Sequence, residues 1–173
     1  MPNITITTKS GGAREEKVKS ILEDILNTYD LSKYAFTDTV LIESWVKPHS
    51  HPVLTLSTRK FDEHRLLSTY VHEQIHWFLD EKEQEAEAVI AELREHYKKV
   101  PVGDPEGASS EYSTYLHLIV CPLEYTALKR LLGDDTAKEI MLGHEGYQWI
   151  YRTTIHDYEF LMGMIRKHGL ELE

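Results

Sequence analysis

The segment from Glu63 to about Asp80 constrains the fold more than any other part of the chain. Its apolar residues recur at helical spacing, so it predicts an amphipathic helix. Within it stands His72-Glu73-Gln74-Ile75-His76, where two imidazoles are four residues apart. On a helix this spacing places both rings on one face, one turn apart, with Glu73 on the flank of that face. The other side carries large apolar residues that must be buried: Leu67, Tyr70, Val71, Ile75, Trp77 and Phe78.

Two histidines in this arrangement can bind a single zinc ion through their ring nitrogens. The glutamate between them then lies beside the open side of the metal, where it can act as a general base. His72 and His76 are therefore candidate zinc ligands, and Glu73 is the candidate base. A catalytic zinc normally has three protein ligands and leaves the fourth position to water, so a further ligand must come from elsewhere in the chain.

The composition predicts an ordinary globular protein with one domain over residues 1–173. Of these residues, 41% are hydrophobic and 28% are charged, and the formal net charge is −10. That charge disfavours nonspecific binding to nucleic acid or to an anionic membrane. The N-terminus lacks the pattern of a signal peptide, and no apolar run approaches the ~20 residues of a membrane span. Cys121 is the single cysteine, which fits a reducing compartment, so we expect a cytoplasmic protein.

The first third of the chain predicts a small sheet with one helix. Residues Asn3 to Thr8 alternate as a short strand does, and Ala13 to Tyr29 has the apolar stripe of an amphipathic helix. Two β-rich runs follow, Thr39 to Val46 and Val53 to Ser57, and the short proline-containing link between them predicts a hairpin-like pair. Asp62 is placed to cap the motif helix.

The remainder predicts helices. An apolar stripe from Ala86 to Tyr97 predicts a helix that ends before Pro101. Three more helical segments follow: one that ends at Gly133, one from about Thr136 to Leu142, and one from Tyr147 to His168. The expected class is α+β, with a small N-terminal sheet and a backing helix, then the motif helix, then a mostly helical C-terminal part.

The segment Val71 to Phe78 resembles the active-site helix of the zincin metallopeptidases, and the order of predicted elements is similar to theirs. The resemblance implies a zincin-like fold and a zinc-dependent hydrolase, specifically a metallopeptidase that acts on peptide or protein substrates. In that mechanism Glu73 takes a proton from the attacking water and passes it to the leaving amine. The alternative is a non-catalytic zinc-binding or protein-interaction domain that keeps the helix as a scaffold.

Within the superfamily, the gluzincin pattern fits best. The metzincin pattern requires a glycine and a further histidine soon after the motif, and neither follows His76. Peptide deformylase has its cysteine ligand before the motif, whereas Cys121 comes after it. The gluzincin resemblance implies a glutamate ligand from a later helix.

Glu124 is the candidate for this third zinc ligand. It is a lone carboxylate in the apolar stretch from Tyr115 to Tyr125, where an uncompensated charge would be costly to bury. The stretch is either one helix kinked at Pro122 or a strand followed by a helix that begins near Pro122, in which case Glu124 would be an acid of the first turn.

His117 and Glu85 are the alternative ligands. Gluzincins often have an aspartate four residues after the ligand glutamate; here that position is Leu128, so the group that orients Glu124 is unassigned.

Other polar residues are weaker candidates for a role in the site. The resemblance implies a group that stabilises the negative charge of the reacting carbonyl oxygen, and Tyr147 and His156 are the candidates. His49 and His51 flank one serine between two prolines and predict an exposed turn rather than a second metal site. Cys121 has apolar neighbours and predicts a buried thiol, with a role as a zinc ligand left open.

Overall fold

The computed structural model describes residues 4–59 and 62–172. These residues form one three-stranded sheet, seven α-helices and a short 3-10 turn, which confirms the α+β class and the largely helical C-terminal part. The chain falls into two compact units, the first ending at Phe78 and the second beginning at Leu79. The single domain over residues 1–173 stays a prediction.

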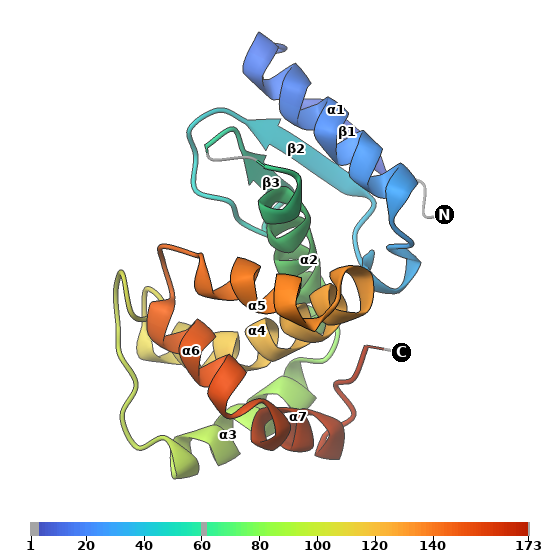
Figure 1. Cartoon of the computed structure of the whole chain (residues 1–173). Coiled ribbons are helices and arrows are strands. Elements are labelled where there is room, and N and C mark those ends of the chain that lie inside the picture. Colours follow the sequence, from blue (N-terminus) through green and yellow to red (C-terminus); the bar gives the residue numbers. More distant parts are fainter. Residues whose placement is uncertain (1–3, 60–61, 173) are drawn as a thin grey trace. The chain divides into compact units, whose positions relative to one another are not determined.

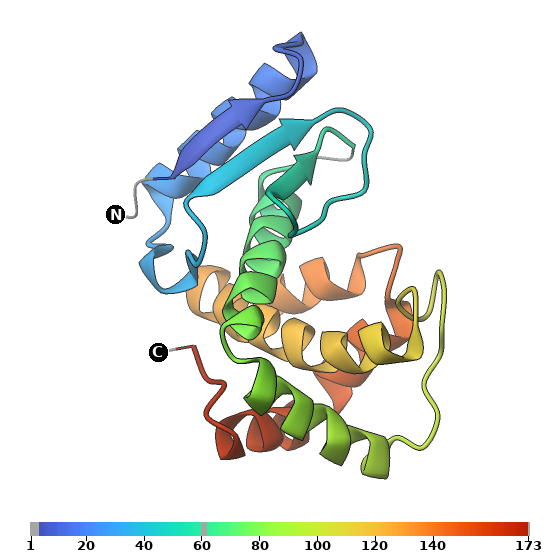
Figure 2. The same cartoon turned by 180° about the vertical axis from the view of Figure 1, so that it is seen from behind.

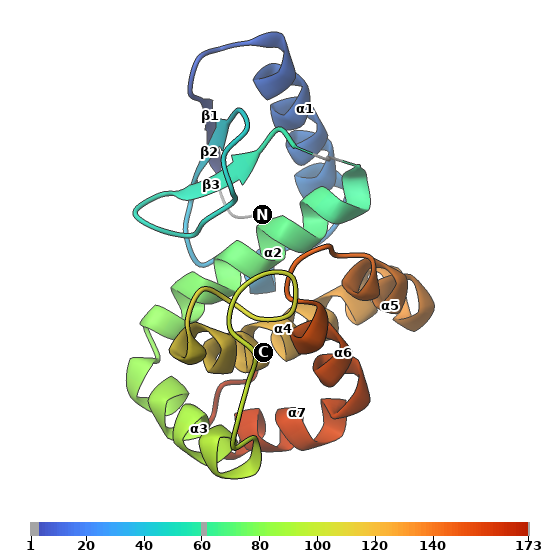
Figure 3. The same ribbon diagram turned by 90° about the vertical axis from the view of Figure 1, so that its left-hand side faces the viewer.

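The first unit is a small sheet with helices. Its elements are β1 (Thr5–Thr8), α1 (Ala13–Thr28), η1 (Ser32–Tyr34), β2 (Thr39–Glu43), β3 (Leu54–Ser57) and α2 (Glu63–Asp80), of which the last two residues belong to the second unit. The strand order is β1-β2-β3, and α1 packs along β1 and β2 with Val18, Leu22 and Ile25 fully buried (Figures 1 and 3). The helix and the sheet thus form two layers, as the apolar stripe of α1 predicts.

The predicted hairpin is wrong, because β2 and β3 are parallel. Val40 lies opposite Leu54, and Glu43 lies opposite Ser57. Between the strands the chain reverses direction twice: the backbone of His49 exchanges two hydrogen bonds with Thr55 in antiparallel fashion, at 3.1 and 2.8 Å. The link between the strands thus runs antiparallel to β3 at His49, whereas β3 itself runs parallel to β2.

The second unit is built around one central helix. Its helices are α3 (Glu83–His96), α4 (Glu111–Leu132), α5 (Asp134–Leu142), α6 (Gln148–His156) and α7 (Tyr158–Lys167). The helix α4 packs against each of the other four, and Figure 2 shows it crossing the middle of this unit. Most of its residues from Thr114 to Leu128 are buried, which explains why its sequence is apolar on all sides.

The helix predicted from Tyr147 to His168 is interrupted at Asp157. The break lets α6 pack on α4 and α5 while α7 packs on α3 and α4. The Asp157 carboxylate accepts a hydrogen bond of 2.6 Å from the hydroxyl of Tyr97, which follows α3. The apolar periodicity continues through the break, so the sequence pattern alone does not reveal it.

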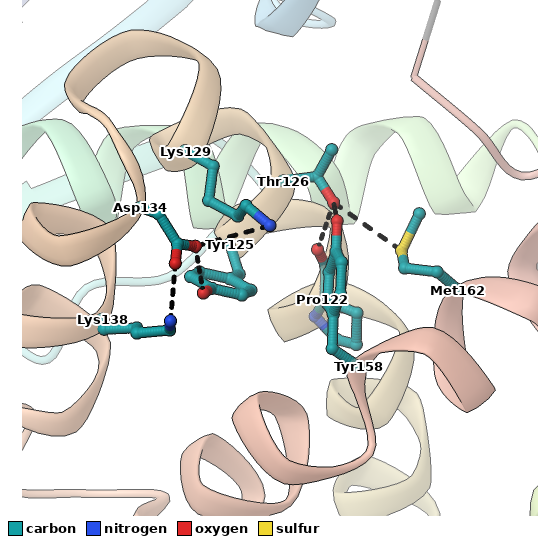
Figure 4. A network of polar contacts seen from close by, with 8 residues as sticks. All are labelled: Pro122, Tyr125, Thr126, Lys129, Asp134, Lys138, Tyr158 and Met162. Atoms are coloured by element: carbon teal, nitrogen blue, oxygen red, sulfur yellow. Dashed lines mark hydrogen bonds and ion pairs between the residues drawn. The ribbon is translucent and has the colours of Figure 1, made fainter.

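A polar cluster fixes the junction of α4 and α5 (Figure 4). Asp134 accepts a hydrogen bond of 2.6 Å from the Tyr125 hydroxyl and pairs with Lys129 and Lys138. Gly133 ends α4 with a φ of 87°, a conformation that favours glycine, and this confirms the predicted end of the helix.

Within the described residues, no helix combines the length and the apolar character that crossing a bilayer requires.

Candidate metal centre

The histidines of the motif lie on α2 as predicted. The ring centroids of His72 and His76 are 5.2 Å apart, one helical turn along the same face. His72 and Glu73 are each only 7% exposed, and His76 is half-buried. His72 and Glu73 are therefore largely shielded from water.

Gln74 fixes the rotation of α2 about its axis. Its side-chain oxygen accepts hydrogen bonds from the backbone of Phe36 at 2.7 Å and Thr37 at 2.8 Å. Its amide nitrogen donates to the Thr37 carbonyl at 2.9 Å and to the Tyr70 hydroxyl at 3.0 Å. Because Gln74 points away from the two histidines on the helix, these four bonds set the direction in which the imidazoles project. The sequence prediction missed this residue, since a glutamine on a helix is usually exposed to solvent.

Trp77 and Phe78 hold the end of the motif in the first unit. The Trp77 indole N–H donates to the Ser50 carbonyl at 2.9 Å, and its ring stacks on His51 with centroids 4.2 Å apart. The ring of Phe78 packs against the ring of Phe36, with centroids 5.0 Å apart. His51 is exposed, as the turn prediction requires, and it covers one face of the indole.

In the second unit, α4 continues without interruption through Pro122. This resolves the two alternatives for the apolar stretch, because Glu124 lies in the interior of a long helix and not in a first turn. On a helix His117, Cys121 and Glu124 fall within about 60° of one another, so α4 presents three potential metal donors on one face.

Glu124 is fully buried, with 0% exposure. The Tyr151 hydroxyl donates to its Oε2 atom at 3.5 Å. Cys121 is a buried free thiol, as predicted, and burial raises its pKa well above the ordinary value, with the nearby Glu124 charge acting in the same direction. The neutral thiol is consequently a poor nucleophile.

His117 has a defined tautomer. Its Nδ1 atom lies 2.6 Å from the Ser113 carbonyl oxygen, which can only accept, so Nδ1 carries a proton and, in the neutral ring, Nε2 holds the lone pair. Metal-binding histidines typically have this arrangement, in which a carbonyl orients the ring. Its ring packs against Tyr147, with centroids 4.5 Å apart.

The remaining predicted residues occupy different environments. Tyr147 precedes α6 with a φ of 57°, an unusual backbone conformation for a bulky residue. His156 ends α6, where its side chain is 87% exposed and pairs with Asp157 at 2.6 Å. Glu85 lies half-buried on α3, with a carboxylate oxygen 4.0 Å from the Lys82 amine. The roles predicted for these residues stay predictions.

Tyr151 is a residue of this region that the sequence prediction did not name. It lies in the segment that supplied Tyr147, and only its buried position on α6 distinguishes it from the other aromatic residues there, so no local sequence signal could have found it.

Comparison of the chain with protein-family models, with curated proteins and with solved structures gives no match in any of the three.

Proposed function

We propose that this chain is a zinc-dependent hydrolase with a zincin-like fold, a metallopeptidase that acts on peptide or protein substrates. His72, His76 and Glu124 are the zinc ligands, and Glu73 is the general base. The observation that carries the proposal is the arrangement of α2: two imidazoles one turn apart, with a buried glutamate between them, on a helix whose rotation Gln74 fixes.

The donor chemistry fits zinc. Two imidazoles and one carboxylate are a common ligand set of catalytic zinc, which leaves the fourth position to water. Glu124 supports this assignment because its buried carboxylate shares one face of α4 with two other potential metal donors, His117 and Cys121. His117, with Nε2 as its lone-pair nitrogen, is the alternative third ligand.

The side chains have distinct tasks in the proposed reaction. Zinc, when bound, acts as a Lewis acid that polarises the scissile carbonyl and lowers the pKa of water. Glu73 accepts a proton from the attacking water and delivers it to the leaving amine. Its buried position limits the access of bulk water, which strengthens electrostatic interactions within the site. Tyr147 and His156 are the proposed donors to the carbonyl oxygen as negative charge develops there.

Metal content tests the ligands. Protein purified without a His tag is expected to contain about one equivalent of zinc, and His72→Ala is expected to lose it, since removal of a ligand weakens binding. The matched control is His64→Ala, which changes an exposed histidine of the same helix and should retain the metal. Wild-type protein with less than about 0.2 equivalents would refute the zinc site.

Hydrolysis of a mixed peptide library tests the base. Glu73→Gln is expected to keep its zinc and to lose about 10²–10⁴-fold in rate, the usual contribution of a positioned general base. Glu23→Gln, an exposed change on α1, serves as the control. Unchanged hydrolysis in Glu73→Gln would refute the mechanism, and a wild-type protein that binds zinc but cleaves nothing would favour the non-catalytic alternative.

A further inference from the structure

We infer that Tyr151 is the positioning residue of the proposed centre: its hydroxyl orients the Glu124 carboxylate for metal binding. This inference rests on the proposed function, and it fills the role that the apolar Leu128 leaves unassigned. The two residues belong to α4 and α6, which pack directly against each other.

The contact between Tyr151 and Glu124 is buried. Glu124 is 0% exposed and Tyr151 is 4% exposed, and the hydroxyl donates to Oε2 at 3.5 Å. A hydrogen bond of this length is weak by itself. Strong hydroxyl-to-carboxylate bonds are about 2.5–2.7 Å long, so at 3.5 Å this contact directs the carboxylate rather than holding it tightly.

A stacking contact restrains the Tyr151 ring. The ring stacks almost parallel on His144, with centroids 4.7 Å apart and planes at 16°. The same hydroxyl acts on the Cys121 thiol, whose pKa it lowers against the larger effect of burial, and Cys121 precedes Glu124 by about one turn on the same face of α4. The hydroxyl is therefore directed at the face of α4 that carries Cys121 and Glu124. The stacked imidazole restricts rotation of the Tyr151 side chain.

The chemical consequence follows from how carboxylates bind metals. A carboxylate that accepts a hydrogen bond on one oxygen presents the other in a defined direction, and loss of such a partner typically costs 10–100-fold in metal affinity or activity. Leu128 is fully buried and has no polar group, so it cannot do this for Glu124. The hydroxyl from α6 supplies such a hydrogen bond.

Zinc affinity, measured by competition with a chelating dye, tests the inference. Tyr151→Phe keeps the ring and removes only the hydroxyl, so we expect zinc binding to weaken by about 10–100-fold. The matched control is Tyr125→Phe: Tyr125 is also a buried tyrosine of this unit, and its hydroxyl donates to the Asp134 carboxylate at 2.6 Å. This control should bind zinc as the wild type does.

A second readout separates positioning from general loosening of the fold. The absorption bands of the cobalt(II)-loaded protein report the arrangement of the ligands, and they are expected to change in Tyr151→Phe and not in Tyr125→Phe. Unchanged affinity and spectrum in Tyr151→Phe would overturn the positioning role, as would equal losses in both variants. Wild-type protein that binds no zinc would instead overturn the proposed function, and this inference with it.

Discussion

Individual side chains of the first unit determine where the motif residues point. Gln74 forms four hydrogen bonds, two to backbone N–H groups, one to a carbonyl and one to the Tyr70 hydroxyl. A side chain with this many partners fixes one rotation of α2, because any other rotation would leave buried polar groups unsatisfied.

Gln74→Ala is expected to destabilise the protein by roughly 1–3 kcal/mol, because it leaves half-buried backbone groups of residues 36 and 37 without this partner. The free energy of unfolding from urea denaturation measures the effect. Gln84→Ala, an exposed change on α3, should lie within about 0.5 kcal/mol of the wild type. Equal stabilities of the two variants would contradict the anchoring role of Gln74.

Glu15 links the start of α1 to the ends of two strands. Hydrogen bonding from the Ser10 backbone N–H at 2.7 Å, with further bonds from the Ser10 hydroxyl and from Ser44, lowers its pKa from 4.5 to about 2. Because the folded pKa is depressed, the contribution of Glu15 to stability is present above the unfolded value and is lost as the pH falls from about 4.5 to about 2.

Glu15→Gln should therefore show a shallower loss of stability over this acidic range than the wild type does, together with lower stability near neutral pH. Denaturant unfolding at several pH values checks the slope. Glu16→Gln, at the exposed neighbouring position, should follow the wild-type curve. A Glu15→Gln slope identical to that of the wild type would show that this carboxylate does not govern the acid response.

At the scale of elements, capping places the start of the motif helix. Asp62 accepts a hydrogen bond of 2.9 Å from the backbone N–H of Arg65, as its predicted capping role requires. Asp62→Ala is expected to cost about 1 kcal/mol of stability, and Asp62→Asn should retain most of it because its amide oxygen can still accept. Thermal denaturation compares the two, and equal losses would argue against the cap.

Local sequence patterns predict some of the helices and strands but not how they pack or pair. Apolar periodicity predicts α1, α3 and the motif helix well, since burial of one face is a local property of the sequence. Pro122 normally disfavours a helix interior, yet α4 passes through it, because packing against four neighbouring helices outweighs the cost. The direction of β3 relative to β2 depends on the path of the link between them, and no periodicity encodes that path.

For the whole molecule, zinc binding should raise the free energy of unfolding. A ligand that binds only the folded state at about 100 times its dissociation constant adds about 2.7 kcal/mol to the free energy of unfolding. A chelator should therefore lower the melting temperature of the wild type and of His64→Ala, and should leave His72→Ala unchanged. If neither zinc nor the chelator changes the melting temperature of the wild type, the proposed centre is contradicted.

Local sequence patterns specify the helical periodicity, the Asp62 cap, the glycine that ends α4 and the shared face of His72 and His76. These features depend on residues within a few positions of one another, where helix geometry relates sequence spacing directly to direction in space. Long-range packing specifies the parallel pairing of β3, the break at Asp157, the anchoring of Gln74 and the position of Tyr151 beside Glu124. Those features join residues far apart in the chain, and which of them meet depends on how the elements bury one another, which no local pattern records.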